Sequence, residues 1–309
     1  MTTSHSVLSE SNHPDAIERE LSWLLKVDPL WRSDTSVDCV PLKKICNGSI
    51  TEIANNLSNE WAWHGAPKRL GRRFESLLTA LFEQTEQCKL LKHGLVVRDQ
   101  KQTLGEFDYL IQLDSQVLHL EVAIKFYAGI GSSSDRSRQQ AWIGPSCQDR
   151  LDIKINHLLH HQLQLSQTEH GQEALDQHDL PTPDQTLGLI YGYLIQPWNA
   201  VDQRPEHTHD SHPAFWAPHQ QALKAMRHLS RPYSTDYGWT RLERDQWIAP
   251  YAGQATLPQV IRSLELPMQA DCYALNHKQH VGVEKLRLFV MRNEFEQEAH
   301  HMLDRAHIV

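Results

Sequence analysis

Two carboxylates and a lysine in the middle of the chain have the spacing of a catalytic metal site. Residues 104–113 and 117–127 both alternate apolar and polar side chains, which indicates two strands joined by a short turn. Asp108 projects from the polar face of the first strand. Glu121 and Lys125 project from the polar face of the second strand. On that face His119 precedes Glu121, and Ala123 lies between Glu121 and Lys125. Facing side chains on paired antiparallel strands approach closely, so we expect the two carboxylates to meet.

Two adjacent carboxylates predict a site for Mg²⁺ or Mn²⁺. Such hard cations prefer oxygen ligands and usually keep water and substrate phosphate in the remaining positions. The cation lowers the pKa of a bound water and neutralises charge on a phosphodiester. A lysine on the same face, here Lys125, would position that water or stabilise the transition state. The chemistry predicted from Asp108, Glu121 and Lys125 is therefore metal-dependent hydrolysis of nucleic acid.

The lysine departs from the spacing that this chemistry favours. Lys125 follows Glu121 by four residues, which separates the two backbones by roughly 13 Å along a strand, instead of roughly 7 Å for a spacing of two. Ala123 stands at the closer position. The long lysine side chain recovers part of that gap.

A helix preceding the strands offers a third carboxylate and a basic cluster. The apolar stripe of residues 70–82 predicts a helix that begins near Lys68 and stops before Gly94. Glu75 lies beside the stripe and is expected to reach over the sheet edge to the metal. The first turn of this helix carries Arg69, Arg72 and Arg73. Basic side chains there oppose the helix dipole, so we interpret these three as phosphate contacts. The alternative is that they form a solvated face.

The bulk composition excludes several classes of protein. The 309 residues carry a formal net charge of −8, which argues against a protein that coats nucleic acid by charge alone but allows a local basic cleft. No apolar run is long enough to span a bilayer, and the polar N-terminus is no secretory signal. Five scattered cysteines without a CxxC pair predict reduced thiols and a cytoplasmic location. P-loop, dinucleotide and Ser/His/Asp motifs are absent from the sequence.

The remaining periodicities predict an α/β fold with one elaborated domain. Helices are expected at 14–31, 49–61, 148–165 and 219–229. Further strands are expected at 95–98, 186–195 and 286–292, and in a segment that ends at Trp247 and Ile248. Residues 129–144 and 170–184 read as polar connections. We predict an N-terminal helical segment packed on the core (1–67), the core (68–200) and a C-terminal extension completing the same domain (201–309).

These residues resemble the PD-(D/E)XK nuclease superfamily, whose restriction-endonuclease-like core has the order helix, three strands, helix, strand in a mixed sheet flanked by helices. More narrowly, the chain looks like the bacterial domain-of-unknown-function 1853 family. The supporting segments are residues 19–25, 119–127, 142–145, 148–152, 237–239, 247–250 and 287–290. The resemblance implies metal binding by Asp108, Glu121 and Glu75.

The same resemblance implies roles for the next helix. Gln148 resembles the helix glutamine that some branches place near the metal, and Lys154 is a second candidate for the displaced lysine. An alternative reading makes Asp149 a charge at the helix N-terminus and Arg150 a salt-bridge partner. We therefore include Gln148, Arg150 and Lys154 among the expected nucleic-acid contacts.

Two further features fit no motif, and two functions remain open. The His-rich segment 206–212 is interpreted as incidental, because the chain has 20 histidines. Four tryptophans are interpreted as core packing, and base stacking is the alternative. They are Trp198, Trp216, Trp239 and Trp247.

The first function is a metal-dependent nuclease acting on DNA or RNA. The second is a catalytically degenerate nuclease fold that binds nucleic acid or a partner protein, which Ala123 favours.

Overall fold

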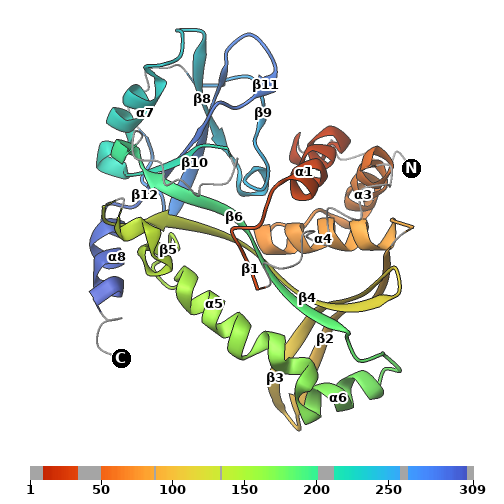
Figure 1. The fold of residues 1–309 in the computed structure, drawn as a ribbon. Helices are drawn as coiled ribbons and strands as arrows, with labels where there is room; N and C mark the ends of the chain where they lie inside the picture. Colours follow the sequence, from red (N-terminus) through yellow and green to blue (C-terminus); the bar gives the residue numbers. More distant parts are fainter. Residues whose placement is uncertain are drawn as a thin grey trace. The chain divides into compact units, whose positions relative to one another are not determined.

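The computed structural model describes residues 10–33, 50–86, 88–132, 134–200, 212–257 and 264–304. They form a mixed α/β fold with a ten-stranded mixed sheet and flanking helices (Figure 1). The chain divides into two compact units. Unit 1 comprises residues 1–124 and 156–191, and unit 2 comprises residues 125–155 and 192–309. Most of the His-rich segment lies outside the described residues.

The helices of unit 1 follow the predicted apolar stripes. They are η1 (Glu10–Asn12), α1 (Pro14–Lys26), α3 (Ile50–His64) and α4 (Leu70–Glu83). Pro14 suits the first turn of α1 because its missing N–H would have no helical partner there. On α4, the stripe side chains Phe74, Leu77, Leu78 and Leu81 are buried. This burial, more than intrinsic propensity, stabilises helices of this length.

The sheet strands of unit 1 contain the predicted hairpin. β2 (Cys88–Asp99), β3 (Gln102–Leu113) and the first part of β4 (Gln116–Gly129) are antiparallel neighbours. The short strand β1 (Trp31–Arg32) pairs with Leu189 and Ile190 of β6 (Gln185–Pro197). Asp114 adopts a positive φ of 54° in the turn between β3 and β4. That conformation is one that Asp tolerates better than most residues.

Two expectations for unit 1 are wrong. Gly94 was expected to end a helix, but it lies inside β2 with φ 67°. A bulge between Leu90 and Lys92 interrupts the alternation of β2 and hides the strand in the sequence. The expected polar linker 170–184 contains α6 (Glu169–Asp176). Thr168 caps this helix by accepting from the Gly171 N–H, and Leu175 is buried beneath it.

The expected helix 148–165 is divided. α5 (Leu151–His160) is followed by the 3₁₀ helix η4 (Gln162–Gln167). Leu165 of η4 packs with Leu95, Phe107 and Leu110. η4 therefore covers β2 and β3 at this point.

Unit 2 is built on parallel and antiparallel strands. β7 (Ala214–Pro218) pairs in parallel with the end of β6 and with β12 (Arg287–Met291), and the antiparallel strands β10 (Ala270–His277) and β8 (Tyr237–Leu242) follow. The end of β4 pairs with β5 (Trp142–Ile143), and β9 (Ala252–Gly253) pairs with β11 (Gly282–Val283). The predicted strand 286–292 is confirmed, whereas β7 and β10 were not predicted.

Unit 2 contains two short helical elements within residues 129–144. The sequence predicted a polar connection there, and this prediction is wrong for the helical residues. They are η2 (Asp135–Ser137) and η3 (Gln139–Ala141). The others are η5 (Trp198–Ala200), η6 (His219–Gln221), α7 (Ala222–Ser230), η7 (Arg244–Gln246) and α8 (Phe295–Asp304). Trp198, Trp216, Trp239 and Trp247 are all buried, which agrees with core packing. No helix of the described residues is long and apolar enough to cross a membrane.

A half-buried histidine gives unit 2 a pH-dependent stability. Burial, together with the neighbouring charges of Arg287 and Lys285, lowers the pKa of His212 to about 3 from 6.5. Between these values the unfolded chain binds a proton that the folded chain does not, so stability falls as pH falls below 6.5. We expect His212 to contribute roughly 2 kcal/mol less at pH 5 than at pH 7. Urea unfolding at both values checks this, and an equal pH dependence in His212→Gln would contradict it.

Candidate functional site

Asp108 and Glu121 come together where the β3–β4 ladder stops. The paired residues run from Leu113 and Gln116 to Tyr109 and Leu120, and the two carboxylates lie immediately beyond. There the Val122 N–H donates to Asp108 Oδ2 at 3.0 Å, and the Asp108 N–H donates to Glu121 Oε1 at 3.3 Å. Each carboxylate therefore accepts a backbone N–H from the strand opposite. These side-chain contacts hold the two strands together without backbone pairing.

Glu121 is fully buried and held on both oxygens. His119 Nε2 lies 2.8 Å from Oε1, and the Gln162 side chain donates to Oε2 at 2.5 Å. Asp108 is half-buried. A buried carboxylate is costly unless it is hydrogen-bonded, and Glu121 meets this condition through side chains of β4 and η4. The result is a carboxylate whose orientation is fixed by two neighbouring side chains.

His119 is the second fully buried polar side chain of this cluster. Burial lowers its pKa to about 4, although the nearby Asp108 acts in the opposite direction. His119 is therefore neutral near pH 7, and in the tautomer with the proton on Nε2 it donates to the Glu121 carboxylate. Its Nδ1 has no hydrogen-bond partner within the described part of the chain. The Phe107 ring packs edge-on against it at 4.7 Å between centroids.

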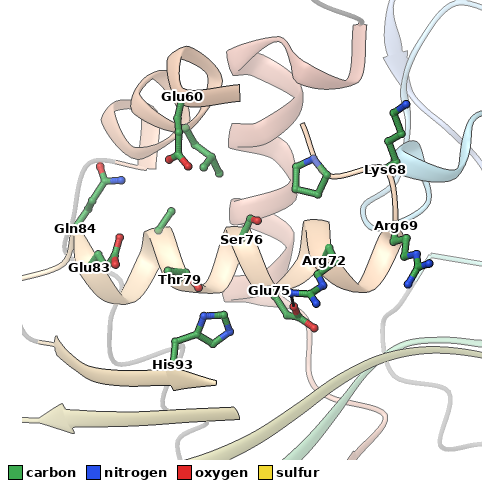
Figure 2. Close-up of a pocket in the computed structure, with 13 residues that line it drawn as sticks. Glu60, Lys68, Arg69, Arg72, Glu75, Ser76, Thr79, Glu83, Gln84 and His93 are labelled. Carbon is green, nitrogen blue, oxygen red and sulfur yellow. Dashed lines mark ion pairs between the residues drawn. The ribbon is translucent and has the colours of Figure 1, made fainter. Parts of the chain in front are cut away.

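Glu75 lines a pocket between α3, α4 and β2. Figure 2 shows Arg72 and Glu75 on the same stretch of α4, with His93 of β2 beneath them and Glu60 of α3 across the pocket. The cavity measures about 560 Å³. The Glu75 carboxylate lies 3.8 Å from the Arg72 guanidinium. The Glu75 backbone oxygen accepts from the Tyr109 hydroxyl at 2.9 Å, which ties α4 to β3.

The basic cluster of α4 divides into exposed and buried members. Arg69 and Arg72 are exposed and line the pocket of Figure 2. Arg73 is fully buried, and its Nε and Nη2 donate to Glu20 at 2.8 to 3.0 Å. The expected phosphate contact of Arg73 would require breaking this core ion pair, so we leave it out of the proposed interface. It points inward because it lies next to the apolar stripe at Phe74.

Lys125 belongs to unit 2 and is bonded there to a carboxylate. Its ammonium group donates to Asp149 Oδ2 at 2.6 Å, and the Tyr127 hydroxyl donates to the same oxygen at 3.2 Å. The Lys125 and Asp149 side chains are about one-third exposed, at 34% and 29%. Sequence reasoning weighed Asp149 only as a helix N-terminal charge or salt-bridge partner, and it gave Tyr127 no role.

The other predicted contacts of unit 2 differ in exposure. Arg150 is buried and donates from Nε and Nη2 to the Asp152 carboxylate, and from Nη1 to the Met302 backbone oxygen. It is therefore a salt-bridge partner, the alternative that the sequence left open. Gln148 is exposed and Lys154 is half-buried.

Gln162 and the role of His119 were missed by sequence reasoning. Strand parity places His119 on the face of Glu121, but nothing in the sequence shows that η4 covers that face. Gln162 lies in a 3₁₀ helix without a readable period. Across the described ranges, no group of three or more His, Cys, Asp or Glu side chains is arranged to hold a metal ion. Asp108 and Glu121 therefore form a two-carboxylate arrangement.

One family model matches residues 19–308, and its description is a domain of unknown function, DUF1853. No curated protein and no solved structure matches the chain. The match covers nearly the whole length and contains both units. The chain belongs to the DUF1853 family.

Proposed function

We propose that Asp108 and Glu121 bind one divalent cation, Mg²⁺ or Mn²⁺, and that the protein hydrolyses phosphodiester bonds of nucleic acid there. The observation that carries this proposal is the meeting of the two carboxylates at the point where β3 and β4 cease to pair. The donor set fits a hard cation, which commonly takes one or two carboxylates with water and phosphate in the other positions. When bound, the cation would supply an activated water and charge neutralisation.

The protein's own groups would orient and support that chemistry. Gln162 and His119 fix the Glu121 carboxylate, as second-layer partners of metal ligands commonly do. Lys125 is proposed to assist and Glu75 to contribute a further carboxylate. Exposed Arg69 and Arg72, together with Gln148 and Lys154, are proposed to contact the nucleic acid backbone.

The order of elements supports a restriction-endonuclease-like core within residues 68–200. α4, β2, β3, β4, α5 and β6 occur in the order helix, three strands, helix and strand, with the short strand β5 before α5 and the helix α6 after it. We propose that this core carries the site, with the segments before and after it completing the fold.

A degenerate nuclease fold is the second candidate, and one contact favours it. The Lys125 ammonium group is already paired with Asp149 at 2.6 Å. A lysine held in this way needs to leave its carboxylate before it can act on a water. The chain would then keep the fold to bind nucleic acid or a partner protein.

Calorimetric titration of Mn²⁺ tests the metal site. We expect the wild type to bind one ion, and Asp108→Asn to bind at least tenfold more weakly, because removal of one carboxylate charge weakens a hard-cation site. Asp114→Asn is the matched control, since Asp114 is exposed in a turn where Asn is equally suitable. Absence of Mn²⁺ binding in the wild type would overturn the metal proposal.

Cleavage assays separate the two candidates. Single- and double-stranded DNA and RNA are incubated with the wild type and Asp108→Asn, with Mg²⁺ or Mn²⁺. Metal-dependent cleavage that is lost in Asp108→Asn supports the nuclease. Nucleic acid binding by the wild type without cleavage of any substrate supports the degenerate fold.

A further inference from the structure

Four arginine side chains are buried in the described part of the chain, and one of them lacks a carboxylate. Arg73 and Arg150 each direct Nε and Nη2 onto one carboxylate, and Arg287 directs Nε onto Glu284. Arg136 is 3% exposed, and its Nε and Nη2 have no hydrogen-bond partner among the described residues. These are the two parallel donors that match a carboxylate or phosphate side-on.

Two contacts anchor the Arg136 backbone and one of its guanidinium nitrogen atoms. Its Nη1 donates to the Gly131 backbone oxygen at 2.5 Å, and the Trp142 indole N–H donates to the Arg136 backbone oxygen. A side chain on Gly129 would overlap the Arg136 Cδ atom, so that glycine makes room for the arginine stem. The neighbouring Asp135 carboxylate is exposed and accepts from Ser132. Burial lowers the pKa of the Arg136 guanidinium, and Asp135 partly offsets this.

Arg136 lines a cavity of about 370 Å³ in unit 2. Its wall contains apolar surface from Trp198, Trp216 and Pro218, amide groups from Asn199 and Gln221, the Glu296 carboxylate and the His300 ring. The volume is within the range of small-molecule sites, which combine apolar walls with a few polar groups. An isolated buried cation costs several kcal/mol unless an anion accompanies it. The cavity beside the Arg136 side chain has room for that anion.

We propose that this cavity binds a small molecule through an oxyanion group, a carboxylate or a phosphate, held side-on by Arg136 Nε and Nη2. The two nitrogen atoms have almost no accessible surface, so binding requires the guanidinium to release the Gly131 oxygen and turn toward the cavity, where the body of the ligand would rest against the tryptophans. The site lies within unit 2 and is independent of the proposed function of Asp108 and Glu121.

Calorimetry with inorganic phosphate, benzoate and a nucleoside 5′-monophosphate tests the proposal at constant ionic strength. We expect at least one of the three to bind the wild type, and the Arg136→Met variant to bind it at least tenfold more weakly. Phosphate or nucleotide binding identifies a phosphate ligand, and benzoate binding a carboxylate. Arg138→Met is the matched control, because Arg138 is exposed two residues away and its loss leaves binding unchanged. Failure of all three probes to bind the wild type overturns the proposal, as does equal binding by Arg136→Met.

Two further measurements separate a ligand site from a structural arginine. Without ligand, Arg136→Met is expected to melt at the same or a higher temperature than the wild type, because a methionine carries no unpaired charge. A lower melting temperature together with unchanged anion binding would identify a purely structural role. If the variant does not fold, the Arg136 Nε–H resonance of the wild type still reports the contact. A bound oxyanion shifts that resonance, and an unshifted resonance at saturation overturns the proposal.

Discussion

Replacing Gly192 by alanine is expected to destabilise the protein by roughly 2–6 kcal/mol, the sum of backbone strain and overpacking. Gly192 lies within β6 at φ 127°, a conformation that residues with a side chain rarely adopt. A Cβ atom there would overlap the Lys125 backbone oxygen. Backbone atoms cannot rotate away as a flexible side chain can, so the strand itself would have to move.

Urea unfolding of Gly192→Ala checks this expectation against Gly282→Ala. Gly282 has a negative φ and no atom within 4 Å of an added Cβ, so its replacement is expected to change stability by less than about 1 kcal/mol. A Gly192→Ala protein as stable as the Gly282→Ala protein would show that the close approach to Lys125 is absent.

Replacing Arg287 by methionine is expected to cost about 3–5 kcal/mol, as is usual when one partner of a buried ion pair is removed. Arg287 is fully buried, with Nε donating to Glu284 at 2.6 Å. Its other nitrogen atoms donate to the backbone oxygens of Trp247 and Ala249 at 2.7 and 2.9 Å. Methionine fills much of the volume but leaves a buried carboxylate and two carbonyl groups without their donor.

A double-mutant comparison separates the charge from the packing. Glu284→Gln combined with Arg287→Met removes the uncompensated charge, so we expect the double variant to be more stable than Arg287→Met alone. Arg241→Met is the control, because the Arg241 side chain is 46% exposed and exposed pairs contribute at most about 1 kcal/mol. An equal decrease in the free energy of unfolding for Arg241→Met and Arg287→Met would contradict the conclusion that the buried ion pair of Arg287 stabilises unit 2.

The parts of the fold with one apolar face were readable from the sequence. α4 has a stripe at helical spacing, and β3 and β4 alternate with a turn between them, so Asp108 and Glu121 could be placed on facing strands. β2 was only partly readable because its bulge shifts the alternation after Leu90. β7 is buried on both faces, so its five residues carry no alternation that would distinguish strand from helix.

The partners of the candidate site were less predictable than its carboxylates. Contacts such as those of Gln162 with Glu121 and Asp149 with Lys125 join residues 41 and 24 positions apart. No local pattern encodes such distances, since they depend on how η4 and the segment before α5 pack. Arg73 illustrates the same limit: charge suggested a surface, whereas its place beside Phe74 takes it into the core with Glu20.

At the end of the β3–β4 ladder, two backbone N–H groups are hydrogen-bonded to the carboxylates, so their amide resonances depend on the protonation or cation binding of those carboxylates. The Asp108 N–H donates to the Glu121 side chain, and the Val122 N–H donates to the Asp108 side chain. Protonation of either carboxylate, or its capture by a cation, withdraws electron density from the acceptor and shifts the corresponding amide proton. Two resonances in a nitrogen–proton correlation spectrum can therefore follow each carboxylate separately, without substrate and without any substitution in the chain.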